Sequence, residues 1–434
     1  MESATPAHSQ AAGAEQLHPA LAALLSRRAL LKSRFKIVEF LDMGGFATVV
    51  KCLDTKSGKE VAAKIVVDAE TDEHGKLTAD TEKNYKAEMK HEHGIYRNIK
   101  GSLQSMPTGI PATYCSGAMV EADKKQPKKN YYLSYLVMEL LGPRVGCMSL
   151  DMQAYRHNKP LLVNHGLCML TALQSLHERG LVHRDIKPDN FCMPYGYDVN
   201  SGDSASQIYL LDMGMAMQWH HPGFSWDDDT YLFCGTVDYS SVRTLFGRHP
   251  TPKDDLEGLA CTLLEMATGE PPFDLMHSGE SSRPLQQDRL RQMAAQKEKQ
   301  WTSMLSAPST PGFIKHWMRH LRSLPAQHTM CTADYDTLRR ILLSHSVGGL
   351  HEMHDDTASS WSAMPVQQQQ SGLKRCLPAA SRVSNMQSYL SDTATMATAV
   401  QSKRFRHREQ QQEEEEEEQD SMACGVTLVG SPEA

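Results

Sequence analysis

Residues 181–193 of the chain read Leu-Val-His-Arg-Asp-Ile-Lys-Pro-Asp-Asn-Phe-Cys-Met. The apolar pair at 181–182 leads into a short polar loop, which presents a carboxylate, an ammonium group and an amide at fixed offsets. Phosphoryl transfer needs such groups, because the protein contributes positioning and charge neutralisation rather than covalent chemistry. We interpret Asp185 as the acceptor of a hydroxyl proton, Lys187 as a cation that steadies the phosphate, and Asn190 as a Mg²⁺ ligand.

This loop resembles the catalytic loop of eukaryotic protein kinases, in which His-Arg-Asp is followed by an Asn five residues after the Asp. The lysine at position 187 is similar to that of the serine/threonine-specific branch. The resemblance implies an α+β, two-lobed protein kinase fold, with a small antiparallel β-sheet lobe plus one helix and a large, mainly helical lobe. Taken alone, this loop could also be an ordinary polar turn between a helix and a strand. The other kinase motifs, and their order along the chain, distinguish the two interpretations.

Composition sets broad limits on the protein's class. The 434 residues, 40% of them hydrophobic, are enough for a two-lobed domain with a tail. A net charge of -7 gives no general attraction to nucleic acid, and no apolar run is long enough for a membrane span. The ten cysteines include no Cys-x-x-Cys pair, which indicates free thiols in a reducing compartment. We therefore expect a monomer in the cytoplasm, the nucleus or both.

Composition also divides the chain into segments. We expect residues 1–34 to form a disordered or short-helix leader. Residues 35–345 would be the kinase domain, with the small lobe and hinge at 35–141 and the large lobe at 142–345. Residues 346–434 are rich in Gln, Ser and Glu and predict a disordered tail, because such a segment cannot bury enough apolar surface to fold alone.

The small lobe is predicted from a run of strands. Residues 35–50 and 60–67 follow the order strand, glycine turn, strand, hydrophilic turn, strand. Because alternate residues of a strand share a face, Ala62 and Lys64 would point together to one side and their odd-numbered neighbours to the other. A small residue beside a lysine leaves room for an adenine ring and gives its phosphates a cation. A solvent-facing lysine on a half-buried strand is the alternative.

The glycine turn departs from the kinase pattern of three glycines, which lets backbone amides approach the nucleotide phosphates. Asp42 stands at the first glycine position and Ala47 at the third, and only Gly44 keeps its place. A stiffer turn with a negative charge should weaken nucleotide binding without abolishing it. The residues that we expect to bind the nucleotide here are Leu41, Asp42, Met43, Gly44, Gly45, Phe46, Ala47, Thr48 and Val49.

A carboxylate has to orient the cleft lysine. The segment 85–99 has helical spacing, and we assign Glu92 to this role, with Glu88, one turn earlier on the same face, as the alternative. The residues around Glu92 resemble the casein kinase I group, in which a Glu is followed three and four residues later by Ile-Tyr. Gly109-Ile110-Pro111 matches the same group.

Residues 137–143, Val-Met-Glu-Leu-Leu-Gly-Pro, also match the casein kinase I group closely. By this resemblance Met138 would lie at the back of the adenine pocket, and Glu139 to Leu141 would be the hinge that binds adenine. Asp212 ends a predicted strand at 208–214 and would be the second metal ligand, because Mg²⁺ favours oxygen donors and bridges the phosphates. The implied cofactors are ATP and Mg²⁺.

The activation segment carries an unusual charge. The casein kinase I group typically reads Gly-Thr-Ala-Arg-Tyr where this chain has Gly-Thr-Val-Asp-Tyr, so Asp238 inverts a charge that helps bind acidic or phosphorylated substrates. With Asp227 to Asp229 nearby, we hypothesise that basic peptides are preferred. The alternative is that these carboxylates cap local backbone. Residues 253–259, followed by an apolar run, predict a capped helix that again resembles the casein kinase I group. By this resemblance Asp255 would anchor the catalytic loop by accepting backbone hydrogen bonds.

Together these motifs predict a serine/threonine protein kinase of the casein kinase I group that acts on protein hydroxyls. The alternative is a nucleotide-binding pseudokinase scaffold with weak or no catalysis. Lys64, Asp185 and Asp212 favour the enzyme. The scaffold is favoured by Asp42 and Ala47 in the glycine turn and by Met213, which stands where the family usually has Phe. A kinase fold that acts on small-molecule hydroxyls is a third interpretation, and the activation segment and the long helical lobe disfavour it.

Overall fold

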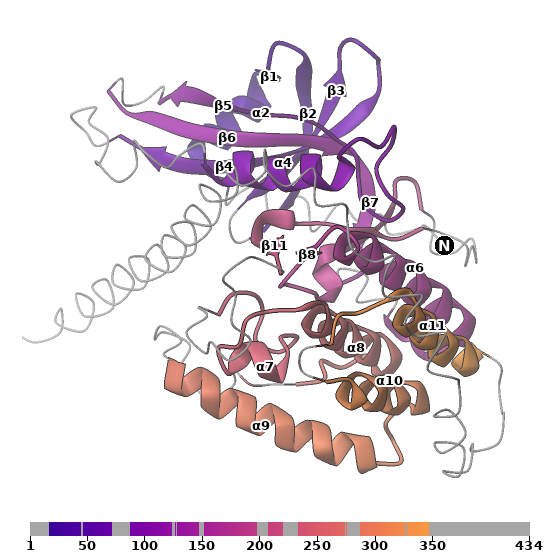
Figure 1. Cartoon of the computed structure of the whole chain (residues 1–434). Helices are drawn as coiled ribbons and strands as arrows, with labels where there is room; N and C mark the ends of the chain where they lie inside the picture. The colour runs from indigo at the N-terminus through magenta and orange to yellow at the C-terminus, as the bar shows by residue number, and fades with distance from the viewer. Residues whose placement is uncertain are drawn as a thin grey trace, which may run out of the picture.

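The fold is α+β and two-lobed, as the sequence predicts (Figure 1). The computed structural model describes residues 17–44, 47–71, 87–123, 126, 128–146, 152–197, 207–219, 233–273, 275, 287–325 and 328–346. The elements of the small lobe and the hinge ribbon are α2 (Pro19–Ser26), β1 (Leu30–Leu31), β2 (Phe35–Met43), β3 (Thr48–Asp54), β4 (Glu60–Glu70), α4 (Ala87–Lys100), β5 (Thr113–Ala122), β6 (Asn130–Glu139) and β7 (Leu141–Arg144).

The large lobe is mainly helical. Its helices are α5 (Met152–His157), α6 (Lys159–His177), α7 (Val242–Leu245), α8 (Pro252–Thr268), α9 (Gln287–Ser306), α10 (Gly312–Ser323) and α11 (Thr332–Ser346). Its strands are β8 (Leu181–Val182), β9 (Phe191–Pro194), β10 (Tyr209–Leu210) and β11 (Met217–Gln218), and short 3-10 helices lie at Pro188–Asn190 and Met213–Met215. No helix within the described ranges is both long and apolar enough to cross a membrane.

One six-stranded antiparallel sheet, in the order β1-β2-β3-β4-β6-β5, forms the small lobe. Its two faces bury different cores. Val61, Ala63 and Ile65 belong to one apolar cluster, whereas Ala62 belongs to the larger cluster that includes residues of α4 and the large lobe. The predicted alternation along β4 is therefore confirmed, and it directs Lys64 toward the cleft, where its ammonium group contacts α4.

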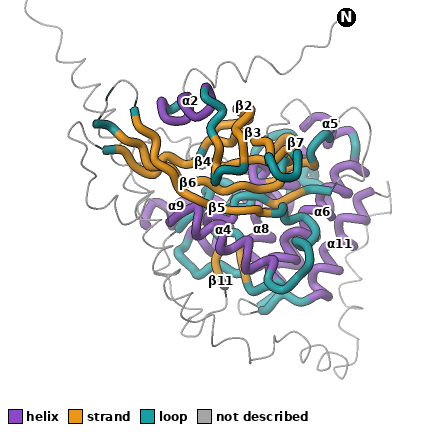
Figure 2. The backbone as a smooth tube through the Cα atoms, turned by 90° about the horizontal axis from the view of Figure 1, so that it is seen from above, coloured by secondary structure: helices purple, strands orange, loops and turns teal. Residues whose placement is uncertain are grey.

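The leader contributes to the small lobe from α2 onward. Leu21 and Leu24 are buried in the cluster on the face of the sheet opposite α4, and β1 pairs with β2 (Figure 2). The side chain of Arg27 forms an ion pair with Glu121 of β5. Apolar packing thus begins before residue 35, the boundary drawn from the sequence, because the outer face of the sheet needs a cover. Residues 1–16 and the predicted tail from 347 onward lie outside the described residues.

The large lobe is built around α8, which is almost entirely buried. The capped helix that the sequence predicts is present, and the structure identifies its capping box as Thr251 and Asp254, with the Thr251 N–H donating to Asp254 Oδ2 at 2.7 Å. Helix α6 packs against α8 and α11. Between the lobes runs a three-stranded ribbon, β10-β9-β7, whose strand β7 continues directly from the small-lobe strand β6. This ribbon joins the hinge to β9, the strand that follows the catalytic loop.

Candidate active site

The cleft lysine lies between two carboxylates. Nζ of Lys64 is 3.0 Å from Oε2 of Glu92 and 2.8 Å from Oδ1 of Asp212. The Glu92 side chain is 1% exposed, whereas that of Asp212 is 42% exposed. The structure therefore brings together three residues that the sequence assigns to nucleotide and metal binding. The side chain of Glu88, the alternative partner, is not among those that the structure describes.

The charges in this cluster stabilise one another. Burial alone would lower the pKa of Lys64, but the Asp212 and Glu92 carboxylates outweigh it and raise that pKa above its usual value. The ammonium group therefore stays charged at neutral pH. Burial, with the same two carboxylates nearby, raises the pKa of Tyr96 well above its usual value, so this phenol stays neutral beside the cluster.

The backbone holds Asp212 in an unusual conformation. Its φ of 60° and ψ of 66° lie in the left-handed region, which costs energy for a residue other than glycine. The preceding residue is fixed on both sides: the Leu211 N–H donates to the Asn190 carbonyl at 2.8 Å, and His183 Nε2 donates to the Leu211 carbonyl at 2.7 Å. The segment that carries Asp212 is thus bound directly to the catalytic loop.

The catalytic loop forms a compact polar cluster around Asp185. Its Oδ1 accepts hydrogen bonds from the Thr236 N–H at 2.9 Å and from the Thr236 hydroxyl at 2.8 Å. Lys187 Nζ lies 2.9 Å from Asp185 Oδ2 and donates to the Thr236 hydroxyl at 2.8 Å. Asn190 Nδ2 donates to the Asp185 carbonyl at 2.6 Å. Asp185, Lys187 and Asn190 therefore meet, as their spacing predicts.

Thr236 and Gly235 were not assigned a role from the sequence. Gly235 has φ +105°, and a Cβ there would lie 2.4 Å from the carbonyl oxygen of Arg184. Only glycine allows the activation segment to approach the catalytic loop this closely. The Gly-Thr pair after Cys234 could have indicated this contact from the sequence. A glycine allows two backbone segments to approach closely, and the hydroxyl of the next residue can then form a hydrogen bond.

Asp255 anchors the catalytic loop from α8, and this prediction is confirmed. Its carboxylate accepts hydrogen bonds from the N–H groups of His183 at 2.7 Å and Arg184 at 2.9 Å. His177 Nε2 lies 2.9 Å from the same carboxylate, and His177 Nδ1 lies 2.6 Å from the Tyr335 hydroxyl on α11. Burial would raise the pKa of Asp255, but these hydrogen bonds and the nearby histidines lower it below its usual value. The carboxylate thus remains charged and acts as a fixed acceptor.

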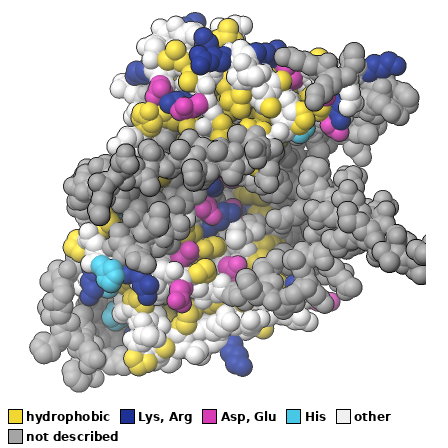
Figure 3. Space-filling view, turned by 180° about the vertical axis from the view of Figure 1, so that it is seen from behind, with side chains coloured by type: hydrophobic (Ala, Val, Ile, Leu, Met, Phe, Trp, Pro, Cys, Tyr) yellow, Lys and Arg dark blue, Asp and Glu magenta, His cyan; other side chains and the backbone are white. Residues whose placement is uncertain are grey.

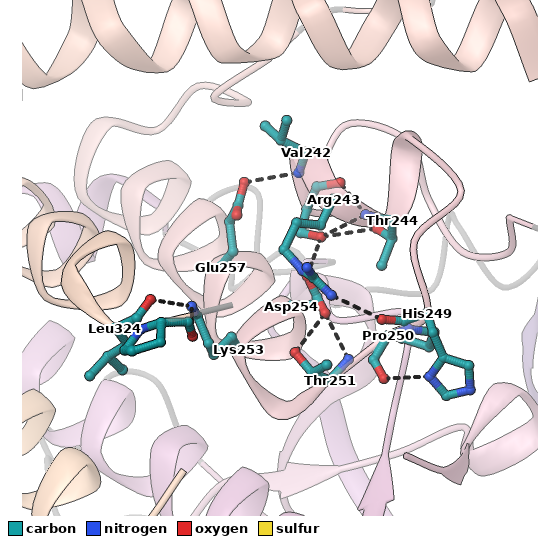
Figure 4. Close-up of polar contacts among 12 residues, drawn as sticks. Val242, Arg243, Thr244, His249, Pro250, Thr251, Lys253, Asp254, Glu257 and Leu324 are labelled. Atoms are coloured by element: carbon teal, nitrogen blue, oxygen red, sulfur yellow. Dashed lines mark hydrogen bonds and ion pairs between the residues drawn. The ribbon is translucent and has the colours of Figure 1, made fainter. Parts of the chain in front are cut away.

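The segment after Thr236 is bound to the start of α8 (Figure 4). The Val242 N–H donates to Glu257 Oε1 at 3.2 Å, and Arg243 Nε lies 3.4 Å from Asp254 Oδ1. In the same view the Thr251 side chain contacts Asp254 as part of the capping box. Helix α8 therefore fixes the catalytic loop and the segment beside it through neighbouring residues of one rigid element.

Asp238 contacts backbone. Its Oδ1 accepts a hydrogen bond from the Leu275 N–H at 3.0 Å, and the fully buried Lys297 donates to the Asp238 and Ser240 carbonyls at 2.7 and 2.6 Å. This arrangement favours the alternative in which the carboxylate caps backbone, and the basic-peptide preference stays a prediction. Asp227 to Asp229 lie outside the described residues.

The expected adenine pocket is apolar. Ala62 and Met138 are register partners on β4 and β6, and both belong to the cluster against which Leu41 and Val49 pack. Glu139 Oε2 accepts a hydrogen bond from the Ala112 N–H at 3.0 Å, which fixes the start of the hinge. Leu141 follows in β7, opposite Pro194 of β9. These residues are arranged as the hinge prediction requires, and their contact with adenine stays a prediction.

The glycine turn connects β2 to β3. The Gly44 N–H donates to the Ala47 carbonyl at 2.9 Å, and Met43 pairs with the buried Thr48. Gly45 and Phe46 lie outside the described residues. The Asp42 carboxylate lies 2.7 Å from Nη2 of Arg144, a residue that no sequence motif singled out. Figure 3 shows acidic and basic side chains gathered between the two lobes on one face of the molecule.

The residues present fit a Mg²⁺ ion that is completed by nucleotide oxygens. Within the described ranges no group of three His, Cys, Asp or Glu side chains could hold a metal ion. Magnesium is commonly held by one or two protein oxygens together with substrate phosphates. The Asp212 carboxylate is partly exposed, and the Asn190 amide nitrogen is committed to Asp185, which leaves its oxygen as the ligating atom.

Comparisons with known proteins agree with this geometry. The family model of the protein kinase domain matches residues 35–323. A probable casein kinase I homolog of Encephalitozoon cuniculi is 28% identical over 261 residues, which cover 59% of this chain and 73% of that protein. A casein kinase I homolog of Kluyveromyces lactis is 26% identical over 261 residues, 59% of this chain and 43% of that protein. Casein kinase I homolog 3 of Schizosaccharomyces pombe is 28% identical over 200 residues, 45% of this chain and 41% of that protein. The chain therefore belongs to the protein kinase family and is casein kinase I-like within it.

Proposed function

We propose that the chain is a serine/threonine protein kinase that transfers the γ-phosphoryl group of ATP to protein hydroxyls. The observation that carries this proposal is the joint arrangement of Lys64 with Glu92 and Asp212, and of Asp185 with Lys187 and Asn190. A scaffold needs no such arrangement, because binding alone does not require a proton acceptor and a phosphate cation held side by side.

In this mechanism Asp185 accepts the proton of the substrate hydroxyl. The hydrogen bond from the Thr236 hydroxyl and the ion pair with the Lys187 ammonium group hold its carboxylate in a fixed orientation. Lys187, which is shared between Asp185 and Thr236, neutralises charge on the moving phosphoryl group. Asn190 and Asp212 would hold Mg²⁺, which when bound would supply charge neutralisation on the phosphates. Lys64 orients the nucleotide phosphates, with Glu92 as its fixed counter-ion.

The substrates of this reaction would be proteins with serine or threonine hydroxyls. The protein would act in the cytoplasm or the nucleus, since the seven cysteines that the structure describes are all free thiols. The alternative, a nucleotide-binding pseudokinase, is favoured by Asp42 at a position where the family has glycine. Asp42 and Ala47 would then account for weak or absent transfer.

The test is transfer of labelled phosphate from ATP and Mg²⁺ to casein and to the chain itself. The wild type is compared with Asp185→Asn and Asp212→Asn, and with Glu298→Gln as a control for an exposed carboxylate on α9. We expect transfer by the wild type and the control, and a loss of at least about 100-fold in both site variants. A folded wild type that is stabilised by ATP but transfers no phosphate would establish the pseudokinase instead.

A further inference from the structure

We propose that Arg144 is a positioning residue for nucleotide binding, which acts by holding and neutralising Asp42 at the start of the glycine turn. This role rests on the proposed function only in requiring that the cleft binds ATP. Arg144 would change the affinity for ATP, whereas the rate of phosphoryl transfer depends on the catalytic loop. Neither residue belongs to the kinase pattern that the rest of the cleft follows.

The pair joins the two lobes at the nucleotide end of the cleft. Asp42 is on β2 in the small-lobe sheet, whereas Arg144 ends β7, which pairs with β9 in the hinge ribbon. Nη2 of Arg144 lies 2.7 Å from Oδ2 of Asp42. Asp42 is the register partner of Val49, which packs against the apolar cluster that contains the expected adenine pocket. The contact therefore lies beside the expected nucleotide site.

The charge of Asp42 explains why it needs a partner. Its other oxygen, Oδ1, accepts a hydrogen bond from the Met43 N–H at 2.8 Å, so donors hold both oxygens. A lone carboxylate near a triphosphate would repel it, and a guanidinium at hydrogen-bonding distance cancels most of that field. The side chain of Asp42 is 43% exposed and that of Arg144 is 30% exposed, so solvent and salt screen the ion pair. We expect an effect on nucleotide affinity that is modest and salt-dependent.

The ribbon that carries Arg144 is well placed to act as a fixed support. A Cβ on Gly142 would lie 2.4 Å from the Pro194 carbonyl oxygen, which shows how closely β7 lies against β9. The residue that directly follows β9 makes a second contact with the small lobe, where the Tyr195 hydroxyl donates to Oε2 of Glu60 at 2.8 Å. Arg144 is therefore presented from a ribbon that, together with the residue after it, contacts the sheet at two places.

The test is a double-mutant cycle on nucleotide affinity, with the full chain as Arg144→Ala, Asp42→Gly and the double variant. A fluorescent ATP analogue with Mg²⁺ gives the Kd at low and high salt, and kcat and KM for ATP are measured in parallel. We expect Arg144→Ala to raise Kd by about threefold to tenfold at low salt and by less at high salt. KM for ATP should rise with Kd, kcat should change less than twofold, and Arg144→Lys should restore part of the affinity.

In the Asp42→Gly background, removal of Arg144 should change Kd less than twofold, because the charge it neutralises is gone. The matched control is Arg322→Ala, which breaks an ion pair with Glu298 of 2.8 Å and similar exposure on α10 and α9. An equal rise in Kd with and without Asp42 would overturn the proposal, and so would an unchanged Kd in Arg144→Ala. A coupled rise in Kd without any phosphoryl transfer would support this inference and refute the kinase activity. A folded wild type that binds no nucleotide would refute both.

Discussion

The two ends of the cleft are held together in different ways. At the catalytic end each charged group has several partners: Asp185 contacts Lys187, Asn190 and Thr236, and α8 fixes the loop through Asp255. At the nucleotide end, in the part of the chain that the structure describes, a partly exposed ion pair joins Asp42 at the start of the glycine turn to Arg144 across the lobes. The catalytic loop is therefore highly constrained, whereas the start of the glycine turn depends on a contact that solvent and salt screen. The following variants test whether this difference is real.

The largest effect is expected where the activation segment touches the catalytic loop. A Cβ in Gly235→Ala would lie 2.4 Å from the Arg184 carbonyl, and the loop beside Asp185 would have to move. We expect kcat to fall about 100-fold to 1000-fold, since small displacements of catalytic groups are costly. The Kd for an ATP analogue should change less than twofold.

Gly58→Ala is the matched control for this variant. Gly58 also has a positive φ, +71°, but a Cβ there would meet no atom within 4 Å. It therefore carries the same kind of backbone strain without the contact, and kcat should stay near the wild-type value. Equal loss of kcat in both variants would mean that backbone strain alone, and not the close approach, explains the effect.

The anchor of the catalytic loop should give the next largest effect, on stability. Asp255→Ala leaves the buried N–H groups of His183 and Arg184 without their acceptor, and we expect the free energy of unfolding to fall by about 3 kcal/mol. Urea denaturation measures this, with Asp336→Ala, at an exposed ion pair, as a control that should change stability by less than about 0.5 kcal/mol. A decrease in the free energy of unfolding of less than about 1 kcal/mol for Asp255→Ala would show that the catalytic loop keeps its conformation without this anchor.

The comparison also explains what the sequence could and could not predict. The positions of Lys64, Asp185 and Asp212 follow from motifs with fixed spacing, and their meeting in space follows from the fold that those motifs imply. The Asp42–Arg144 contact joins two strands of different sheets, and no local spacing encodes it. The sequence indicated that the glycine turn carries an unusual negative charge at Asp42. Only the structure shows that Arg144 lies close enough to neutralise it.

The leader shows the same limit on a larger scale. The sequence predicted a disordered segment or a short helix before residue 35. A short helix, α2, is present, and the structure adds that it covers one face of the small-lobe sheet while β1 forms an edge strand of that sheet. Pro19 lies at the first position of α2, where proline is tolerated because its missing N–H would have no partner within the helix. The structure of the leader depends on the apolar face of the sheet that it covers, and most of that face is formed by strands later in the chain. Contacts between such distant segments cannot be read from the local sequence.

The cover of the small lobe should give a moderate effect on stability and little effect on catalysis. Leu24 is fully buried against the sheet, and Leu24→Ala should lower the free energy of unfolding by about 2 to 3 kcal/mol. Leu30→Ala, at a residue that is 51% exposed, should cost less than about 1 kcal/mol. Thermal or urea denaturation separates these values, and unchanged stability in Leu24→Ala would show that the leader is not part of the cooperative unit.

The smallest effect is expected from pH, through the histidine that caps α2. His18 Nδ1 accepts a hydrogen bond from the Ala20 N–H, and burial lowers the pKa of His18 below its usual value of 6.5. Because the unfolded chain binds a proton that the folded chain does not, stability should fall as pH drops below about 6.5, with a slope of at most about 1.4 kcal/mol per pH unit.

The variant His18→Asn keeps an accepting side chain at the cap but cannot titrate, so its stability should depend less on pH between about 7 and 5. Burial also lowers the pKa of His93, His320 and His345, so the variant should reduce the slope rather than remove it. Identical slopes in the two proteins would mean that the cap does not respond to protonation, and that the cover of the small lobe is held by its apolar contacts alone.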